Sequence, residues 1–357
     1  MNNLEKMGMT AEVNSLFEEY RSKGFELGRV ALEHKHSYRV WLETGEYLCT
    51  LAGKLTYDAL HREDLPAVGD WVAVKTSPGE LKGTIQGILP RFSKFSRKAA
   101  GMTTEEQIVA ANVDTVFIVN SLNDDLNLRR IERYLLLAWE SGATPVLILS
   151  KADLADDLAD KIELVNAVAL GIPVIAISVV NSAGIDELRS YLAPGKTVAL
   201  IGSSGVGKSS LVNSLTGFEK QAVQGIRESD DKGKHTTTHR EMIMLQEGAI
   251  LIDTPGMREV QLWTSEEGIH ESFAEIEEYA SACRFRDCSH TNEPGCAVQS
   301  AIDNGLLDED RFASYKKLQK ELAYIDRKVD KKAQADEKRH WKNISKDIRQ
   351  KTKFKRK

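Results

Sequence analysis

One segment limits the possible folds of this chain more than any other: the glycine-rich run GSSGVGKS from Gly202 to Ser209. The apolar stretch Thr197–Ile201 precedes it, and residues 209–215 after it have a helical pattern. A strand, such a loop and a helix, in that order, form a phosphate-binding loop. Its backbone N–H groups surround the phosphates, Lys208 reaches the β- and γ-phosphates, and the Ser209 hydroxyl binds Mg²⁺. The sequence therefore predicts a nucleotide-binding α/β domain.

A second phosphate motif follows downstream, where the apolar strand 250–252 ends in Asp253-Thr254-Pro255-Gly256. An acidic residue at the end of such a strand holds a water of the magnesium shell, and Gly256 can offer its N–H to a γ-phosphate. The residues expected to bind phosphate and Mg²⁺ are Gly202, Ser203, Ser204, Gly205, Val206, Gly207, Lys208, Ser209, Ser210, Asp253 and Gly256.

The base is expected to be guanine. The apolar run Val146–Leu149 is followed by Ser150-Lys151-Ala152-Asp153, which matches the Asn-Lys-x-Asp pattern except for Ser150. Asp153 would accept hydrogen bonds from guanine N1–H and the exocyclic amine, and Lys151 would pack its stem over the ring. Adenine lacks that pair of donors, so the carboxylate penalises ATP. Ser178, at the end of a later strand, would bring a backbone amide to the base.

The order of these motifs is unusual, because the base motifs precede the phosphate loop. We therefore predict a circularly permuted domain with the doubly wound sheet of a P-loop GTPase. The strands expected in it are 114–120, 145–149, 173–177, 197–201, 241–245 and 249–252.

The segment from residue 25 to 89 alternates apolar and polar residues in about five short runs, with glycines and prolines between them. This pattern predicts a small β-barrel, either OB-like or SH3-like. Directly after it, Arg91–Lys98 alternates cations with Phe92 and Phe95. Either the rings stack on RNA bases while the cations hold phosphate, or Phe92 and Phe95 pack between domains while the cations stay solvated.

Three of the four cysteines lie within a short segment that also contains a histidine: Cys283, Cys288, His290 and Cys296. Three thiolates and one imidazole are the ligands of a closed structural zinc site. Beyond it, Phe312, Tyr315, Leu318, Leu322, Ile325 and Val329 repeat at helical spacing. Cys49, on a predicted strand, is expected to belong to the core.

Charge is unevenly distributed along the chain. Residues 326–357 carry fourteen Lys and Arg against five Asp and Glu, whereas the chain as a whole has a net charge of −5. A basic tail on an acidic body indicates a polyanionic partner such as RNA. No run of about 20 apolar residues and no signal-peptide pattern is present, so we expect a cytoplasmic protein with no membrane partner.

With its permuted order, preceding barrel, Gly233-Lys234-His235-Thr236-Thr237-Thr238 run and cysteine cluster, the chain resembles the ribosome small-subunit-dependent GTPase A family of bacteria. The resemblance implies an OB-like barrel within residues 1–100, a permuted GTPase domain in 101–265, and a zinc-binding helical domain with a basic tail in 266–357. It also implies GTP hydrolysis stimulated by the small ribosomal subunit, late in the maturation of that subunit, with GTP-dependent binding to rRNA and release on hydrolysis.

The resemblance assigns the first switch to Thr236, Thr237 and Thr238, one of which would complete the Mg²⁺ shell. Met257 stands where many GTPases carry a water-orienting glutamine. The resemblance carries the water-orienting role over to His235 of the Gly-x-His-Thr-Thr-Thr motif, with Lys208 and Thr237 as the other catalytic residues; alternatively, His235 is an exposed loop residue that contacts RNA or nothing. The expected cofactors are one structural Zn²⁺ and Mg²⁺ with GTP, and the protein is expected to act as a monomer. Two alternative functions stay open: an RNA-binding scaffold regulated by guanine nucleotides, with little turnover, and a permuted GTPase that serves the large subunit or another RNA.

Overall fold

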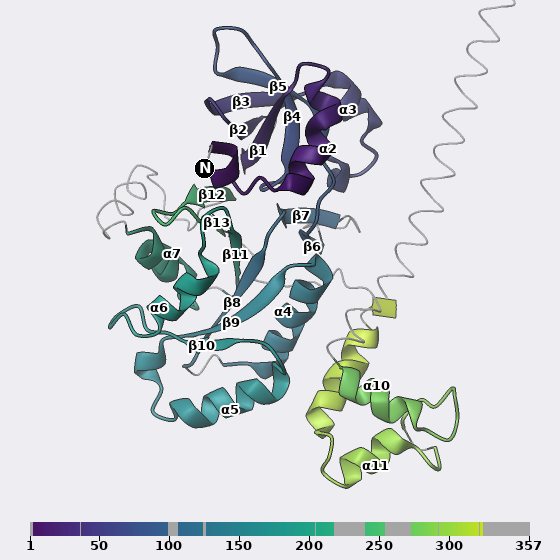
Figure 1. The fold of residues 1–357 in the computed structure, drawn as a ribbon. Coiled ribbons are helices and arrows are strands. Elements are labelled where there is room, and N and C mark those ends of the chain that lie inside the picture. The colour runs from purple at the N-terminus through teal and green to yellow at the C-terminus, as the bar shows by residue number, and fades with distance from the viewer. Residues whose placement is uncertain are drawn as a thin grey trace, which may run out of the picture. The chain divides into compact units, whose positions relative to one another are not determined.

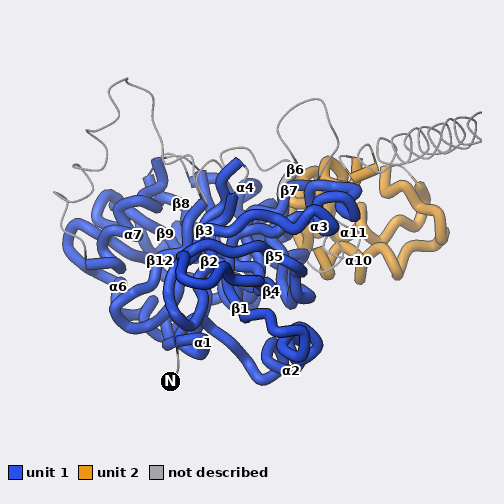
Figure 2. Tube along the Cα trace, turned by 90° about the horizontal axis from the view of Figure 1, so that it is seen from above, with its two compact units in different colours: residues 1–97, 106–262 blue, residues 98–105, 263–357 orange. Residues whose placement is uncertain are grey.

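The computed structural model describes residues 3–35, 37–98, 106–123, 126–203, 205–217, 240–253, 273–291, 293–320 and 322–323. The chain divides into two compact units, shown in Figure 2. The first contains residues 1–97 and 106–262, and the second contains residues 98–105 and 263–357. None of the helices in the described ranges has the length and apolar character needed to cross a membrane.

The N-terminal strands of the first unit form a closed five-stranded barrel. Four of its strand pairs are antiparallel, β3 pairs with β5 in parallel, and β1 closes the barrel against β4. The short helix α3 (Gly53–Asp58) lies between β3 and β4 in the sequence. This is the strand order of an OB-fold, so the OB-like alternative is confirmed. The strands are β1 (Glu26–Glu33), β2 (Tyr38–Leu42), β3 (Gly45–Leu51), β4 (Trp71–Thr76) and β5 (Lys82–Ile88).

Side chains along these strands point alternately into and out of the barrel, and the apolar side chains that point inward fill its interior. Val30, Val40 and Ile85 are fully buried and face one another with Cys49. Burial raises the pKa of the Cys49 thiol to about 12, so it stays protonated and inert, as expected for a core residue. Helices α1 (Asn3–Lys6) and α2 (Ala11–Arg21) precede the barrel, and Phe17 of α2 packs against its outer surface.

The second part of the first unit is an α/β sheet with the strand order β10-β9-β8-β11-β13-β12, in which only β12 is antiparallel (Figure 1). Apolar residues of α6 and α7 pack on one face, in a cluster with Phe117 and Val119. Helix α4 carries its own buried stripe, outside that cluster, and covers the opposite face with α5. The doubly wound, permuted fold is therefore confirmed.

Each predicted strand of this sheet agrees with the structure to within one residue at either end, and 197–201 is unchanged. The strands are β8 (Thr115–Ser121), β9 (Thr144–Ser150), β10 (Val174–Ala176), β11 (Thr197–Ile201), β12 (Glu241–Met244) and β13 (Ile250–Asp253). The helices are α4 (Leu128–Ser141), α5 (Leu158–Val168), α6 (Ile185–Leu188) and α7 (Lys208–Thr216).

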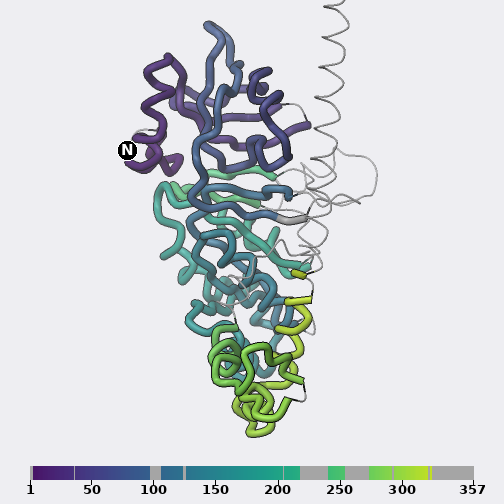
Figure 3. The backbone as a smooth tube through the Cα atoms, turned by 90° about the vertical axis from the view of Figure 1, so that its right-hand side faces the viewer, coloured from purple at the N-terminus to yellow at the C-terminus, as the bar shows by residue number. Residues whose placement is uncertain are grey.

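The barrel and the α/β sheet are joined more closely than the sequence indicated. Strand β12 pairs with β1 at Leu32 and Glu241, so hydrogen bonding continues from one sheet into the other (Figure 3). A two-stranded ribbon of β6 (Lys94–Lys98) and β7 (Glu106–Ala111) connects the two parts along the chain. The boundary expected at residue 100 falls in the undescribed stretch 99–105 and stays a prediction.

The fully buried Arg29 connects the barrel to the segments on either side of it. The Arg29 guanidinium donates hydrogen bonds to the carbonyl oxygens of Met7 (2.5 Å), Gly69 (3.1 Å) and Asn112 (2.8 Å). These acceptors belong to the lead-in after α1, the loop before β4, and the segment before β8. Burial lowers the pKa of Arg29 to about 10, which still leaves it charged at neutral pH.

Nearby, Asp70 is a buried carboxylate held by Arg91, whose Nε and Nη2 each lie 2.7 Å from a carboxylate oxygen. Asp70 also accepts from the backbone N–H of Ala67 at 2.8 Å. Arg91 itself donates further to the carbonyls of Glu63 and Leu65. The Asp70–Arg91 pair therefore closes the loop that carries Gly69.

In the second unit, α10 (Ala274–Ser281) packs with α11 (Ala297–Asp303), and helical residues 309–320 contact α10 through the pairs Arg311–Glu275 and Tyr315–Glu277. Phe312, Tyr315, Leu318 and Leu322 are buried, which confirms this part of the predicted stripe. Ile325, Val329 and the basic tail lie outside the described residues.

We predict that Arg91→Met lowers the free energy of unfolding by about 3–5 kcal/mol at neutral pH, because it leaves the Asp70 carboxylate buried and unpaired. Burial already raises the pKa of Asp70, and loss of Arg91 removes the opposing attraction. An acid whose pKa is higher in the folded than in the unfolded protein destabilises the fold when ionised, so the defect shrinks as the pH falls. Urea unfolding at neutral and at mildly acidic pH measures both effects.

Arg189→Met is the matched control for this prediction, since Arg189 forms its ion pairs with Asp186 and Glu247 on the surface. It is expected to change stability little at either pH. Equal losses in the two variants would contradict the assigned importance of the buried pair.

Candidate functional site

The phosphate loop begins where β11 ends and finishes at the first turn of α7. Gly202, Gly205 and Gly207 have φ angles of 147°, 81° and 93°, a region that favours glycine. A Cβ atom on Gly202 would lie 2.3 Å from the carbonyl oxygen of Val119 on the neighbouring strand β8. The glycines therefore let the loop turn tightly above the sheet, as its phosphate-binding motif requires.

Lys208 occupies the centre of this loop. Its ammonium donates to the carbonyl oxygens of Gly202 and Ser203, both at 2.6 Å. Ser209 and Ser210 are exposed at the N-terminal end of α7, where backbone N–H groups attract anions. The loop is thus preformed and held by the residue whose ammonium would contact phosphate.

The second phosphate motif reaches the same edge of the sheet. Asp253 is the last residue of β13 and pairs in register with Leu200 of β11, next to the phosphate loop. Parallel strands bring their carboxyl ends, and hence Asp253 and the loop, to one edge. The predicted ligands Ser204 and Gly256 lie outside the described residues, as do His235, Thr236, Thr237 and Thr238.

The base motif lies on the opposite side of the phosphate loop, at the end of β9. Ser150 is buried, and its hydroxyl lies 2.5 Å from the carbonyl oxygen of Val206 in the loop and 3.2 Å from that of Asn120 on β8. Lys151 adopts a left-handed conformation, with φ of 60°, and Asp153 is exposed within a short helical turn. Although Ser150 replaces the asparagine of the usual motif, its hydroxyl still connects the base motif directly to the phosphate loop.

Ser178 closes this side of the site. Its N–H donates to the carbonyl of Ala183 at 3.0 Å, which bends the chain back after β10. Gly184 completes the turn with φ of 72°, and a Cβ atom there would lie 2.2 Å from the carbonyl oxygen of Ala176. The structure thus gathers Ser150, Lys151, Asp153 and Ser178 at one edge of the sheet, near the loop.

The cationic and aromatic stretch after the barrel is largely used for packing. Arg91 is committed to Asp70, Lys94 pairs with Glu106 at 2.9 Å, and Phe95 is buried. The packing interpretation therefore holds for Phe95, whereas Arg91 and Lys94 form ion pairs instead of staying solvated as that interpretation expected. Phe92 differs, since it is 51% exposed.

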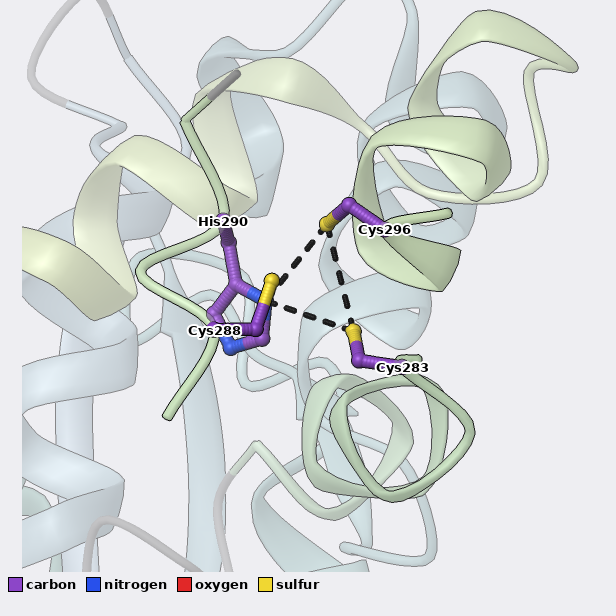
Figure 4. A group of neighbouring side chains, drawn as sticks. All are labelled: Cys283, Cys288, His290 and Cys296. Atoms are coloured by element: carbon purple, nitrogen blue, oxygen red, sulfur yellow. Dashed lines mark hydrogen bonds between the residues drawn. The ribbon is translucent and has the colours of Figure 1, made fainter. Parts of the chain in front are cut away.

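The cysteine cluster of the second unit forms a compact set of ligand atoms (Figure 4). One atom from each of Cys283, Cys288, His290 and Cys296 lies within 4.8 Å of the others. His290 Nδ1 is 3.5 Å from the sulfur of Cys283 and 3.6 Å from that of Cys296, and these two sulfurs are 3.9 Å apart. This group could hold a metal ion.

Local backbone geometry presents these ligands. Cys283 follows α10, and Cys296 caps α11, where its sulfur accepts from the N–H of Gln299 at 3.4 Å. His290 takes a left-handed φ of 54°, and the Gln299 side chain donates to its carbonyl at 2.8 Å. Such outer contacts fix the direction of the ligands.

Residues 88–263 match the model of the RsgA GTPase family, and residues 197–340 match a model described as 50S ribosome-binding GTPase. A small ribosomal subunit biogenesis GTPase RsgA from Opitutus terrae is 45% identical over 350 residues, which cover 96% of this chain and 95% of the relative.

Solved structures agree in fold. YjeQ from Thermotoga maritima superposes with a TM-score of 0.62 at 29% identity, covering 84% of this chain and 99% of that protein. YloQ, described as a circularly permuted GTPase, gives a TM-score of 0.57 at 24% identity over 84% of this chain. The second likeness concerns the fold alone.

We predict that Ser150→Ala weakens GDP binding by about threefold to tenfold, because it removes the hydroxyl that joins the base motif to the phosphate loop. Ser150→Asn is expected to retain most of the affinity, since its amide can donate to the same carbonyl. Equilibrium titration with a fluorescent GDP derivative measures both. Ser190→Ala is the control: the Ser190 hydroxyl donates to a backbone carbonyl on the surface, at 2.9 Å. An unchanged affinity in Ser150→Ala would refute the link.

We also predict one tightly bound metal ion per chain, retained after dialysis and lost in Cys288→Ser. Elemental analysis of the purified protein measures it. Cys49→Ala, at the fourth cysteine, is expected to keep the ion because Cys49 is buried in the barrel core. Metal content that is the same in all three proteins would exclude the cluster as the binding site.

Proposed function

This chain belongs to the RsgA GTPase family, and we propose on that premise that it hydrolyses GTP on the small ribosomal subunit, late in the maturation of that subunit. The observation that carries the proposal is the gathering of the base motif and the phosphate loop at one edge of a permuted sheet, joined by the Ser150–Val206 hydrogen bond. The relative from Opitutus terrae is named for small-subunit biogenesis and matches almost the whole chain. Its name supports the proposed partner.

We propose that different residues at this edge bind different parts of the nucleotide. The phosphate loop and the first turn of α7 bind the phosphates, while Ser209 and Asp253 hold Mg²⁺ and its waters. Asp153 and Lys151 bind guanine, with a backbone amide near Ser178. The roles of Thr236, Thr237, Thr238, Gly256 and His235 rest on the family resemblance.

Hydrolysis needs a water in line with the γ-phosphate. Met257 follows Gly256 and cannot orient a water, so the isolated protein is expected to turn over slowly. In this proposal His235 orients the water and the ribosomal subunit completes the site. Lys208 would neutralise charge that develops on the phosphates, together with the Mg²⁺ that Ser209 and Asp253 would hold.

The metal in the second unit is proposed to be a structural Zn²⁺. Tetrahedral zinc with bonds of about 2.3 Å to sulfur and about 2.1 Å to nitrogen has sulfur–sulfur edges near 3.8 Å and sulfur–nitrogen edges near 3.6 Å. The distances among Cys283, His290 and Cys296 are 3.9, 3.5 and 3.6 Å. With Cys288 the set has four protein ligands, which is typical of a closed site.

Ribosomal RNA is the proposed polyanion. The tail 326–357 has fourteen Lys and Arg, and Arg284 and Arg286 flank the half-exposed Phe285 beside the cysteine cluster. Phosphate contacts of this kind make binding strongly dependent on salt. GTP would favour the bound state and hydrolysis would release the protein, which we propose acts as a monomer in the cytoplasm.

Two alternatives are separated by one experiment. Met257 favours a guanine-nucleotide-regulated RNA-binding scaffold with little turnover, and the match of residues 197–340 to a 50S ribosome-binding GTPase model raises the large subunit as partner. GTP hydrolysis by the purified protein is measured without subunits, with purified small subunits and with large subunits. ATP hydrolysis is measured under the same conditions as the control.

We expect small subunits, but not large subunits, to raise the rate of GTP hydrolysis by at least about tenfold, and we expect ATP to remain intact. Lys208→Ala should lower the stimulated rate about 100-fold or more. Lys196→Ala, which removes an ion pair with Asp114 just before β11, should leave it unchanged. A rate that neither subunit changes would favour the scaffold, and stimulation by large subunits would reassign the partner.

A further inference from the structure

A buried asparagine beside the nucleotide edge has no assigned task. Asn120 is the sixth residue of β8 and is completely buried. Neither its amide oxygen nor its amide nitrogen has a hydrogen-bond partner in the part of the chain that the structure describes. Burying an amide without partners is unfavourable, so a partner that arrives with a ligand explains its presence.

Strand register places the Asn120 side chain on a definite face of the sheet. Asn120 pairs with Leu149, and Ser121 pairs with Ser150. Paired residues of parallel strands point to the same face, and successive residues point to opposite faces. Because the Ser150 hydroxyl reaches Val206 on the face of the α6–α7 cluster, the Asn120 side chain lies on the opposite face, at the same edge.

Lys151 is the donor that the topology brings to that position. It directly follows the last residue of β9, two residues beyond Leu149, the register partner of Asn120, and its left-handed φ of 60° ends the strand there. Within the described ranges the Lys151 ammonium has no hydrogen-bond or ion-pair partner. An unpaired donor and an unpaired buried acceptor thus flank the Ser150 link between base motif and loop.

We propose that Asn120 is a positioning residue of the guanine site: its Oδ1 accepts a hydrogen bond from the Lys151 ammonium when a guanine nucleotide is bound. This inference rests on the proposed function, in which the Lys151 stem packs over the base. The guanine ring excludes water from the Lys151 ammonium. The Asn120 Oδ1 takes the place of that water as a fixed hydrogen-bond acceptor. The stem is then held in its stacking position.

The test measures the affinity of the full chain for a fluorescent GDP derivative. Asn120→Leu is expected to weaken binding about tenfold or more, the effect of losing a hydrogen bond to a charged group. Asn120→Asp keeps the acceptor and should stay within about threefold of the original chain. In a Lys151→Met background, Asn120→Leu should cost no further affinity, because the donor is already gone.

The ligand-free stability separates this role from a structural one. Asn120→Leu removes an unsatisfied amide and should raise the Tm of the ligand-free protein while it weakens binding. Thr197→Val is the matched control: its buried hydroxyl is also unpartnered among the described residues, but lies at the far end of β11. It should raise the Tm and leave the affinity unchanged.

Three outcomes would overturn the inference: unchanged affinity in Asn120→Leu, equal loss in Asn120→Asp, or a full further loss in the Lys151→Met background. Asn120→Ala takes the place of the leucine variant if that variant does not fold. Failure of the unaltered chain to bind the GDP derivative would instead reject the proposed guanine site, so the two failures are distinguishable.

Discussion

The buried guanidinium of Arg29 is the interaction on which the first unit depends. Its three hydrogen bonds end on carbonyl oxygens of Met7, Gly69 and Asn112, which are distant in sequence and belong to different substructures. A charged group removed from water must have its donors satisfied, so these acceptors cannot separate without a large cost. The barrel, its helical lead-in and the start of β8 are therefore fixed together, and β8 in turn borders both the phosphate strand and the base strand.

The permutation leaves the nucleotide site physically unchanged. What matters for binding is that the carboxyl ends of β8, β9, β11 and β13 meet at one edge, whatever order the chain visits them in. The Ser150 hydroxyl illustrates this constraint, because it bonds across to the phosphate loop from a motif that precedes the loop in sequence. The affinity of such a site depends on how firmly these few loops are held in register.

Much of this arrangement could be predicted from the sequence, and for local reasons. Gly202, Gly205 and Gly207 identify the loop because only glycine tolerates its backbone angles, and the Cys/His spacing places four ligands within reach of one ion. The pairing of β1 with β12 could not be predicted, since one register pair leaves no pattern in either strand. The sequence also could not predict that Arg91 and Phe95 are used within the chain, because cations and rings have the same spacing whether they bind a partner or the chain itself.

The pairing of β1 with β12 also sets an order of events during synthesis. The five barrel strands are contiguous, so they can close as soon as they are made, whereas Arg39 of β2 must wait for Glu241, 202 residues later, before that side of the junction forms. Contacts of such long sequence separation form slowly. A nascent chain therefore leaves the Leu32 end of β1 without its partner until β12 has been made, and only then does hydrogen bonding continue from the barrel into the nucleotide-binding sheet.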